Sequence, residues 1–76
     1  MKAIDISRHI VRSSGLSDHV AAKKAGRSVN GFNPYIYRQN MPTLPVLAEL
    51  CNVCDFDLLV RNRKTGEETI IDPPEK

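Results

Sequence analysis

Two glycines divide the first half of the chain into short segments, and each is followed two residues later by a serine. Gly15 precedes Ser17, and Gly26 precedes Ser28 with the same spacing. Glycine often ends a helix because it adopts a positive φ without steric cost. Serine often begins one because its hydroxyl accepts a hydrogen bond from a free main-chain N–H of the first turn. This arrangement favours several short helices over one long one.

Apolar side chains recur at intervals of three and four residues as far as residue 54, which is typical of helices that bury one face. Alanines on the second expected helix would let a neighbouring helix approach closely. Thr43 is suited to cap the fourth helix, and Pro45 is tolerated in its first turn. The helices expected on this basis cover residues 5–13, 18–25, 29–37 and 44–54.

Pro34 complicates the third of these segments, because proline inside a helix costs about 3 kcal/mol through a lost amide bond and a clash. Residues 29–32 could form a separate turn, with Asn33 capping a helix whose first residue is Pro34. Alternatively, the helix is continuous from its cap at Ser28 and bends at the proline. We favour the bent, continuous helix. The positions expected to face inward are Val29, Phe32 and Ile36.

The apolar period changes from three or four to two after residue 55, where Phe56, Leu58 and Val60 alternate onto one face. This alternation predicts a strand. A three-residue turn ending at Gly66 and a return strand complete a hairpin over residues 56–71. The expected fold is mainly α with a C-terminal β-hairpin, a single domain over residues 1–72, and a disordered tail over residues 73–76.

The composition limits the classes of protein and site. The 76 residues include no apolar run near the roughly 20 needed to span a bilayer, and the N-terminus lacks the apolar stretch of a signal peptide. We therefore expect a cytoplasmic protein.

Cys51 and Cys54 have the C-x-x-C spacing but end a helix, so we expect buried, reduced thiols and no metal site. His9 and His19 are expected on the surface. No pairing of nucleophile and base stands out, so we expect neither a cofactor nor an enzyme.

Charge is unevenly distributed along the chain. Residues 1–41 carry seven Lys and Arg against two Asp and Glu, whereas residues 42–76 carry four against seven. A basic half joined to an acidic half would turn the first toward a polyanion and the second away from it.

The segment from Gly15 to Ser28 has the cap, small crossing residue, glycine turn and second cap of a helix-turn-helix. Further on, Leu47-Ala48-Glu49-Leu50 is followed by Phe56-Asp57-Leu58-Leu59-Val60-Arg61. With these motifs the chain resembles the Cro/C1-type (XRE-like) helix-turn-helix family, especially its small phage and mobile-element members. The resemblance implies a four-helix, lambda-repressor-like DNA-binding domain.

The function implied is a sequence-specific regulator of transcription, a repressor or autorepressor, encoded by a bacterium or phage and located on the nucleoid. The third helix would enter the major groove of double-stranded DNA. The candidate base contacts are Asn30, Asn33, Tyr37 and Arg38. The candidate phosphate contacts are Ser17, Lys23, Arg27, Ser28, Tyr35, Gln39 and Asn40.

One such helix buries too little surface to be specific, so we expect a homodimer that reads a palindromic operator. The hairpin is the expected dimerisation element, because two strands alone are marginal and their edges are open to a partner strand. Leu59, Ile70 and Ile71 would supply its apolar surface. In the alternative arrangement, the hairpin folds back onto its own helices.

A second functional hypothesis is a protein-interaction module, for example an antitoxin or an inhibitor of a host defence enzyme. Three residues keep this hypothesis open. Asp18 would repel a phosphate, while Gly31 and Pro34 are poor residues for a reading helix.

Overall fold

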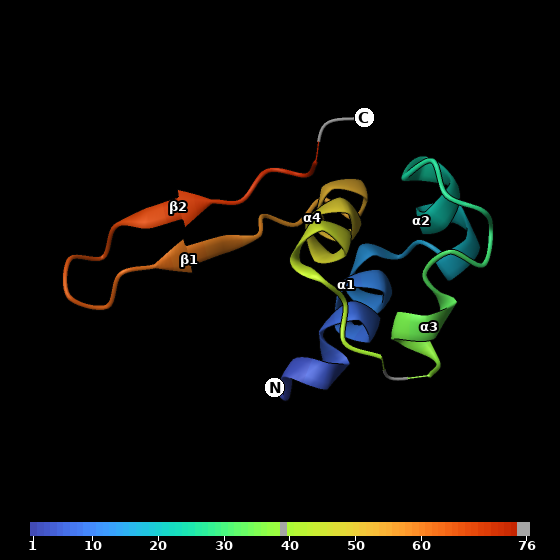
Figure 1. Ribbon diagram of the computed structural model, residues 1–76, viewed down its shortest axis with the longest axis horizontal. Helices are drawn as coiled ribbons and strands as arrows, with labels where there is room; N and C mark the ends of the chain where they lie inside the picture. Colours follow the sequence, from blue (N-terminus) through green and yellow to red (C-terminus); the bar gives the residue numbers. More distant parts are fainter. Residues whose placement is uncertain (39, 75–76) are drawn as a thin grey trace.

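A computed structural model describes residues 1–38 and 40–74, which form a helical body from which a β-hairpin projects (Figure 1). The mainly α class with a C-terminal hairpin is confirmed. The elements are η1 Ala3–Asp5, α1 Ile6–Ser14, α2 Asp18–Lys24, α3 Asn33–Ile36, α4 Leu44–Val53, β1 Leu59–Arg61 and β2 Glu68–Ile70. The hairpin contributes to an elongated shape of 40 × 28 × 21 Å.

Local sequence signals set the ends of the helices. The Ser17 hydroxyl accepts a hydrogen bond from the Val20 N–H at 3.2 Å, and the Thr43 hydroxyl accepts one from the Val46 N–H at 3.5 Å. These two caps begin α2 and α4 where they were expected. Gly15 ends α1 with a φ of 77°, a left-handed conformation that glycine adopts readily.

The core lies where α1, α2 and α4 meet, with the segment that leads into α3 closing one side. Phe32, Ile10 and Leu50 are the largest fully buried apolar side chains. Small alanines on α2 allow the close approach that the sequence suggested. The core cluster consists of Ile10, Val11, Ala21, Ala22, Ala25, Phe32, Ile36, Leu50, Cys51 and Cys54. None of the described helices is long and apolar enough to cross a membrane.

The expectation of a continuous third helix is wrong. The helix α3 is a single turn beginning at Asn33, with Pro34 in its first positions, where the missing amide costs little. Residues 28–32 form turns instead, and the Gly31 N–H donates to the Ser28 carbonyl oxygen at 2.9 Å. The cap of α3 is Phe32, so neither Ser28 nor Asn33 has the capping role considered for it.

The turn geometry also changes which side chains face inward. Phe32 and Ile36 are buried as expected. Val29 is 42% exposed, so its assignment to the core is wrong. Because residues 28–32 do not follow a helical period, the spacing of three from Val29 to Phe32 does not place both side chains on one face.

The two strands pair antiparallel, with Leu59 opposite Ile70 and Arg61 opposite Glu68. The hairpin is closed at its base by the Ile71 N–H, which donates to the Leu58 carbonyl oxygen at 2.7 Å. At the far end, Asn62 pairs with Glu67, so four residues, 63–66, make the turn rather than the expected three.

The hairpin does not fold back onto the helices. Only its base reaches the core, where Phe56 and Leu58 are partly buried. Both strands are exposed along their whole length. Val60, which was expected to share one face of the strand with Phe56 and Leu58, is 60% exposed. In Figure 1 the hairpin leaves the body beside α4 and extends away from α2 and α3.

Candidate nucleic-acid interface

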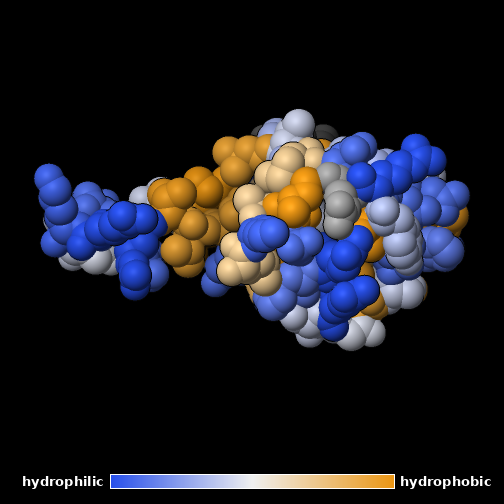
Figure 2. All heavy atoms as spheres, turned by 90° about the horizontal axis from the view of Figure 1, so that it is seen from below, coloured by the Kyte–Doolittle hydropathy of each residue, from blue (hydrophilic) through white to orange (hydrophobic). Residues whose placement is uncertain are grey.

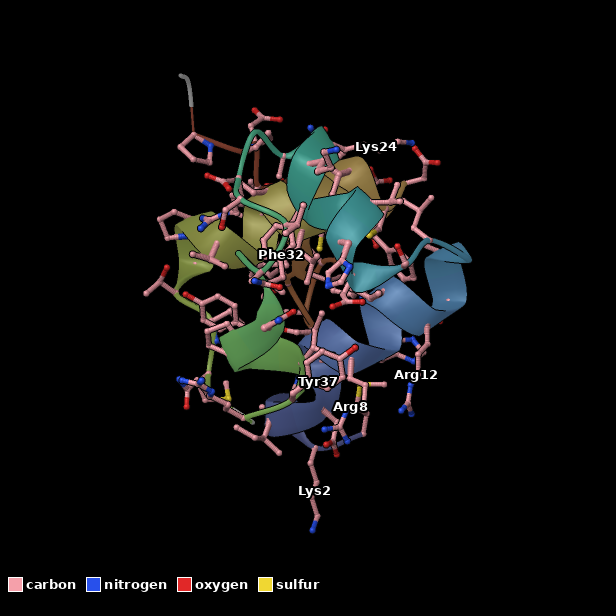
Figure 3. All side chains as sticks on the ribbon, turned by 90° about the vertical axis from the view of Figure 1, so that its right-hand side faces the viewer. Lys2, Arg8, Arg12, Lys24, Phe32 and Tyr37 are labelled. Atoms are coloured by element: carbon pink, nitrogen blue, oxygen red, sulfur yellow. The ribbon has the colours of Figure 1, made fainter. Side chains whose placement is uncertain are left out.

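The side of the body opposite the hairpin carries α2, α3 and one flank of α1 (Figures 1 and 3). Arg8, Arg12 and Lys24 lie on this side and, together with Lys2 at the lower edge of the view in Figure 3, are here called the cationic face. Sequence reasoning selected none of these four residues as contacts. The spacing of four residues between Arg8 and Arg12 was the available signal, because it puts both side chains on one flank of a helix.

Arg8 connects α1 to α3. Its guanidinium donates two hydrogen bonds to the Ile36 carbonyl oxygen, from Nε at 3.1 Å and from Nη2 at 2.8 Å. The carbonyl belongs to the last residue of α3, where no further helical turn supplies a donor. Arg8 therefore holds the end of this one-turn helix against α1, and its positive charge stays at the surface beside Tyr37 (Figure 3).

Arg27, selected from the sequence as a phosphate contact, has partners within the chain. Its Nε lies 2.9 Å from the Glu49 carboxylate on α4, and its guanidinium lies 5.2 Å from the centre of the Phe32 ring. Gly31 passes close to it, since a Cβ at that position would lie 2.7 Å from the Cβ of Arg27. The glycine that looked unsuitable for a helix is thus required for the turns to pack.

Asn30 and Asn33, both selected as base contacts, are brought together by the structure. The Nδ2 of Asn33 donates to the Oδ1 of Asn30 at 3.2 Å. The Oδ1 of Asn33 is buried and has no hydrogen-bond partner among the described residues. Asn30 is exposed, so its own amide group remains able to donate to an acceptor outside the protein.

The two tyrosines have different environments. Tyr37 is 63% exposed, whereas Tyr35 packs partly against the core. The hydroxyl and ring of Tyr37 are therefore accessible from outside the protein. Tyr35 has less free surface.

The other residues selected from the sequence surround α2 and α3. Lys23, Ser28, Arg38 and Asn40 are exposed. The Ser17 hydroxyl already accepts the Val20 N–H. Gln39, a further candidate phosphate contact, lies outside the described residues.

The cysteines lie in the core. Burial raises the pKa of both thiols, and the neighbouring Cys54 raises that of Cys51 further. The protonated thiols are thereby favoured, which opposes both metal ligation and nucleophilic chemistry. Among the described residues, no three His, Cys, Asp or Glu side chains form a group that could hold a metal ion.

Comparisons with protein-family models, curated proteins and solved structures found no match to this chain. Its function is therefore inferred from the charge and geometry of the cationic face and its surroundings.

Proposed function

We propose that this chain is a sequence-specific regulator of transcription that binds double-stranded DNA, in the manner of Cro/C1-type repressors. The observation that carries the proposal is the cationic face, which lies beside the exposed polar side chains of residues 28–38. In this proposal α2, the turns and α3 act as a helix-turn-helix. The operator is a palindrome read by two copies, on the nucleoid of a bacterial or phage-infected cell.

The distribution of charge supports a polyanionic ligand. Arg12 and Lys24 come from different helices but lie on one side (Figure 3). The described acidic residues of the second half are Glu49 on α4, Glu67 and Glu68 in the hairpin, and Asp55, Asp57 and Asp72 in the segments beside them. Lys and Arg side chains bind phosphates irrespective of base sequence and release condensed counterions when they do so. The cationic face would therefore supply affinity, and the acidic half would orient the molecule on the duplex.

The exposed polar residues next to this face supply candidate base contacts. Asn30 can pair with adenine through its amide, and Arg38 can donate to guanine. Tyr37 can hydrogen-bond to a phosphate or pack on a sugar. Because α3 is a single turn, the reading surface includes the turns before it, and the Asn33 amide fixes the position of Asn30.

The first test is duplex binding measured by fluorescence anisotropy at several salt concentrations. We expect affinity to fall steeply with salt, and Lys24→Gln to reduce the log–log slope by roughly 0.9 for one lost phosphate contact. Lys64→Gln is the matched control, because it removes the same charge in the hairpin turn, far from the cationic face. The proposal fails if the wild-type protein binds no duplex at low salt.

The second test separates base reading from phosphate binding. An inverted repeat upstream of the chain's own gene, tested by footprinting, would supply the operator. Asn33→Ala should bring operator and scrambled duplex closer in affinity by about 1–3 kcal/mol per base pair read, whereas Lys23→Ala should weaken both equally. Equal effects of both variants on all sequences would contradict the assigned roles.

A further inference from the structure

Two exposed side chains occupy the corners of the turn that leads from α2 toward α3. The Gly31 N–H donates to the Ser28 carbonyl oxygen at 2.9 Å, which defines a four-residue turn. Its two central residues are Val29, which is 42% exposed, and Asn30, which is also exposed. In Figure 1 the segment between α2 and α3 forms the right-hand edge of the body, away from the hairpin. Val29 and Asn30 therefore lie on the side of the body that the proposed function turns toward the duplex.

Val29 interrupts a run of polar residues. Arg27 and Ser28 precede it, and Asn30 follows it. Figure 2 shows apolar residues gathered at the stem of the hairpin, whereas the opposite end of the body is mainly hydrophilic on the face shown. A ligand that binds the turn would thus meet hydrogen-bonding groups on both sides of one apolar side chain.

The turn is fixed by contacts at both of its ends. At its start, the Arg27 guanidinium lies 2.9 Å from the Glu49 carboxylate and covers the Phe32 ring. At its end, the Asn33 side chain donates to the Oδ1 of Asn30 at 3.2 Å, and the Asn33 N–H donates to the Asn30 carbonyl oxygen at 3.1 Å. A surface held in this way loses little conformational freedom on binding. It can therefore distinguish ligands that differ by one small group.

The major groove of DNA offers matching groups for these two side chains. The Oδ1 of Asn30 accepts one hydrogen bond from Asn33 and keeps a second lone pair, so the amide can still accept from N6 and donate to N7 of adenine. Thymine, the partner of adenine, exposes its C5 methyl group on the same edge. The Val29 side chain has no hydrogen-bonding group, so the methyl is the base-edge group that it would favour.

We propose that Val29 is a specificity-determining residue that packs against the C5 methyl group of an operator thymine. The thymine belongs to the base pair whose adenine Asn30 binds, or to the pair beside it. This inference rests on the proposed function and names the base pair that the turn selects, A·T. The contact is made by the corner of a turn, because the chain enters α3 only at Asn33.

Replacing thymine by uracil tests the contact without changing the protein, since uracil lacks only the methyl group. The probe is the tightest duplex that the wild-type protein selects from a random-sequence pool, with each thymine replaced singly. Affinity is measured by fluorescence anisotropy. At one thymine in each half-site, the replacement should weaken binding by about three- to fivefold, the effect of removing one methyl group from an apolar contact.

A substitution in the protein assigns this effect to Val29. Val29→Ala should bind the thymine duplex more weakly than wild type does, and uracil at the sensitive position should weaken it no further. Val20→Ala is the matched control, because Val20 is 43% exposed but lies on α2, outside the turn. This variant should respond to uracil as wild type does. Circular dichroism checks that both variants are folded.

The outcomes separate this inference from the proposed function. A selected duplex in which no thymine is sensitive to uracil would overturn the inference alone. A response that persists in Val29→Ala, or that is lost equally in Val20→Ala, would do the same. If the wild-type protein selects no duplex from the pool, the proposed function fails and the inference fails with it.

Discussion

Arg8 donates two hydrogen bonds to the Ile36 carbonyl oxygen, across 28 positions of sequence. The last residue of α3 is thus held by a side chain of α1. A one-turn helix has few bonds of its own, so its place on the body depends on such tertiary contacts. The positions of the candidate base contacts in and around α3 therefore depend on Arg8.

We expect Arg8→Ala to lower the free energy of unfolding by about 1.5–3 kcal/mol, as for hydrogen bonds from a charged donor. Urea denaturation followed by circular dichroism measures this change. Arg12→Ala is the control, because Arg12 is exposed on the same helix and should shift stability by no more than about 0.5 kcal/mol. Equal losses in both variants would show that the Ile36 contact contributes nothing beyond charge.

The pair of Arg27 and Glu49 should couple energetically. Both side chains are partly buried, and Arg27 also covers the Phe32 ring. A double-mutant cycle with Arg27→Ala and Glu49→Ala should give a coupling of about 1 kcal/mol. Additive effects would contradict the pairing. Weaker DNA binding by Arg27→Ala at unchanged stability would instead assign this residue to a phosphate.

Asp55 has a φ of 60° directly after α4, a left-handed conformation that is strained for a residue with a Cβ. Asp55→Gly should therefore raise the free energy of unfolding by up to about 1 kcal/mol. Asn52→Gly, at an exposed position inside α4, should lower it by a similar amount, since glycine costs about 1 kcal/mol in a helix interior. Destabilisation by both variants would mean that the Asp55 side chain outweighs the strain.

The buried thiols should react slowly in the folded chain. A thiol reagent such as dithionitrobenzoate should modify Cys51 and Cys54 at neutral pH only after denaturant is added, because burial raises the pKa of both groups. Rapid modification of the native protein would show that the core opens readily.

The raised pKa values of Cys51 and Cys54 also make the free energy of unfolding depend on pH. Below the ordinary thiol pKa of 9.0 both states are protonated, and the stabilising contribution is complete. As pH rises, the unfolded chain ionises first, so this contribution is lost as pH passes through the raised pKa values of the folded state. The variant with both cysteines replaced by alanine should lose stability less steeply in this range.

The sequence was sufficient to predict the structural features that depend on residues close together in the chain. Ser17 and Thr43 begin their helices as predicted, and the alternation after residue 55 does mark a hairpin. These outcomes depend on local hydrogen bonds and on the geometry of a few consecutive residues. The conformation around Pro34 was harder to predict, because a bent continuous helix and a turn followed by a short helix were of similar cost. The packing of Phe32 under Arg27 favours the turns over the continuous helix.

The residues of the candidate site were less predictable because their partners lie far along the chain. An apolar period identifies which face of a helix is buried but does not identify what covers it. Nothing near Arg27 in sequence points to Glu49, and nothing near Arg8 points to Ile36. A basic residue that looks free for phosphate in the sequence can therefore have an internal partner.

The hairpin carries its turn away from the body and brings the residues that follow β2 back to it (Figure 1). Residues 63–66 lie at the far tip, whereas Pro73 and Pro74 return to α4 and line a cavity with Lys24 (Figure 1). A fluorophore attached at the tip can thus report on the hairpin without crowding α2 or α3. A label attached at Pro74 would lie next to Lys24, whose contact with DNA phosphate the salt-dependence experiment tests.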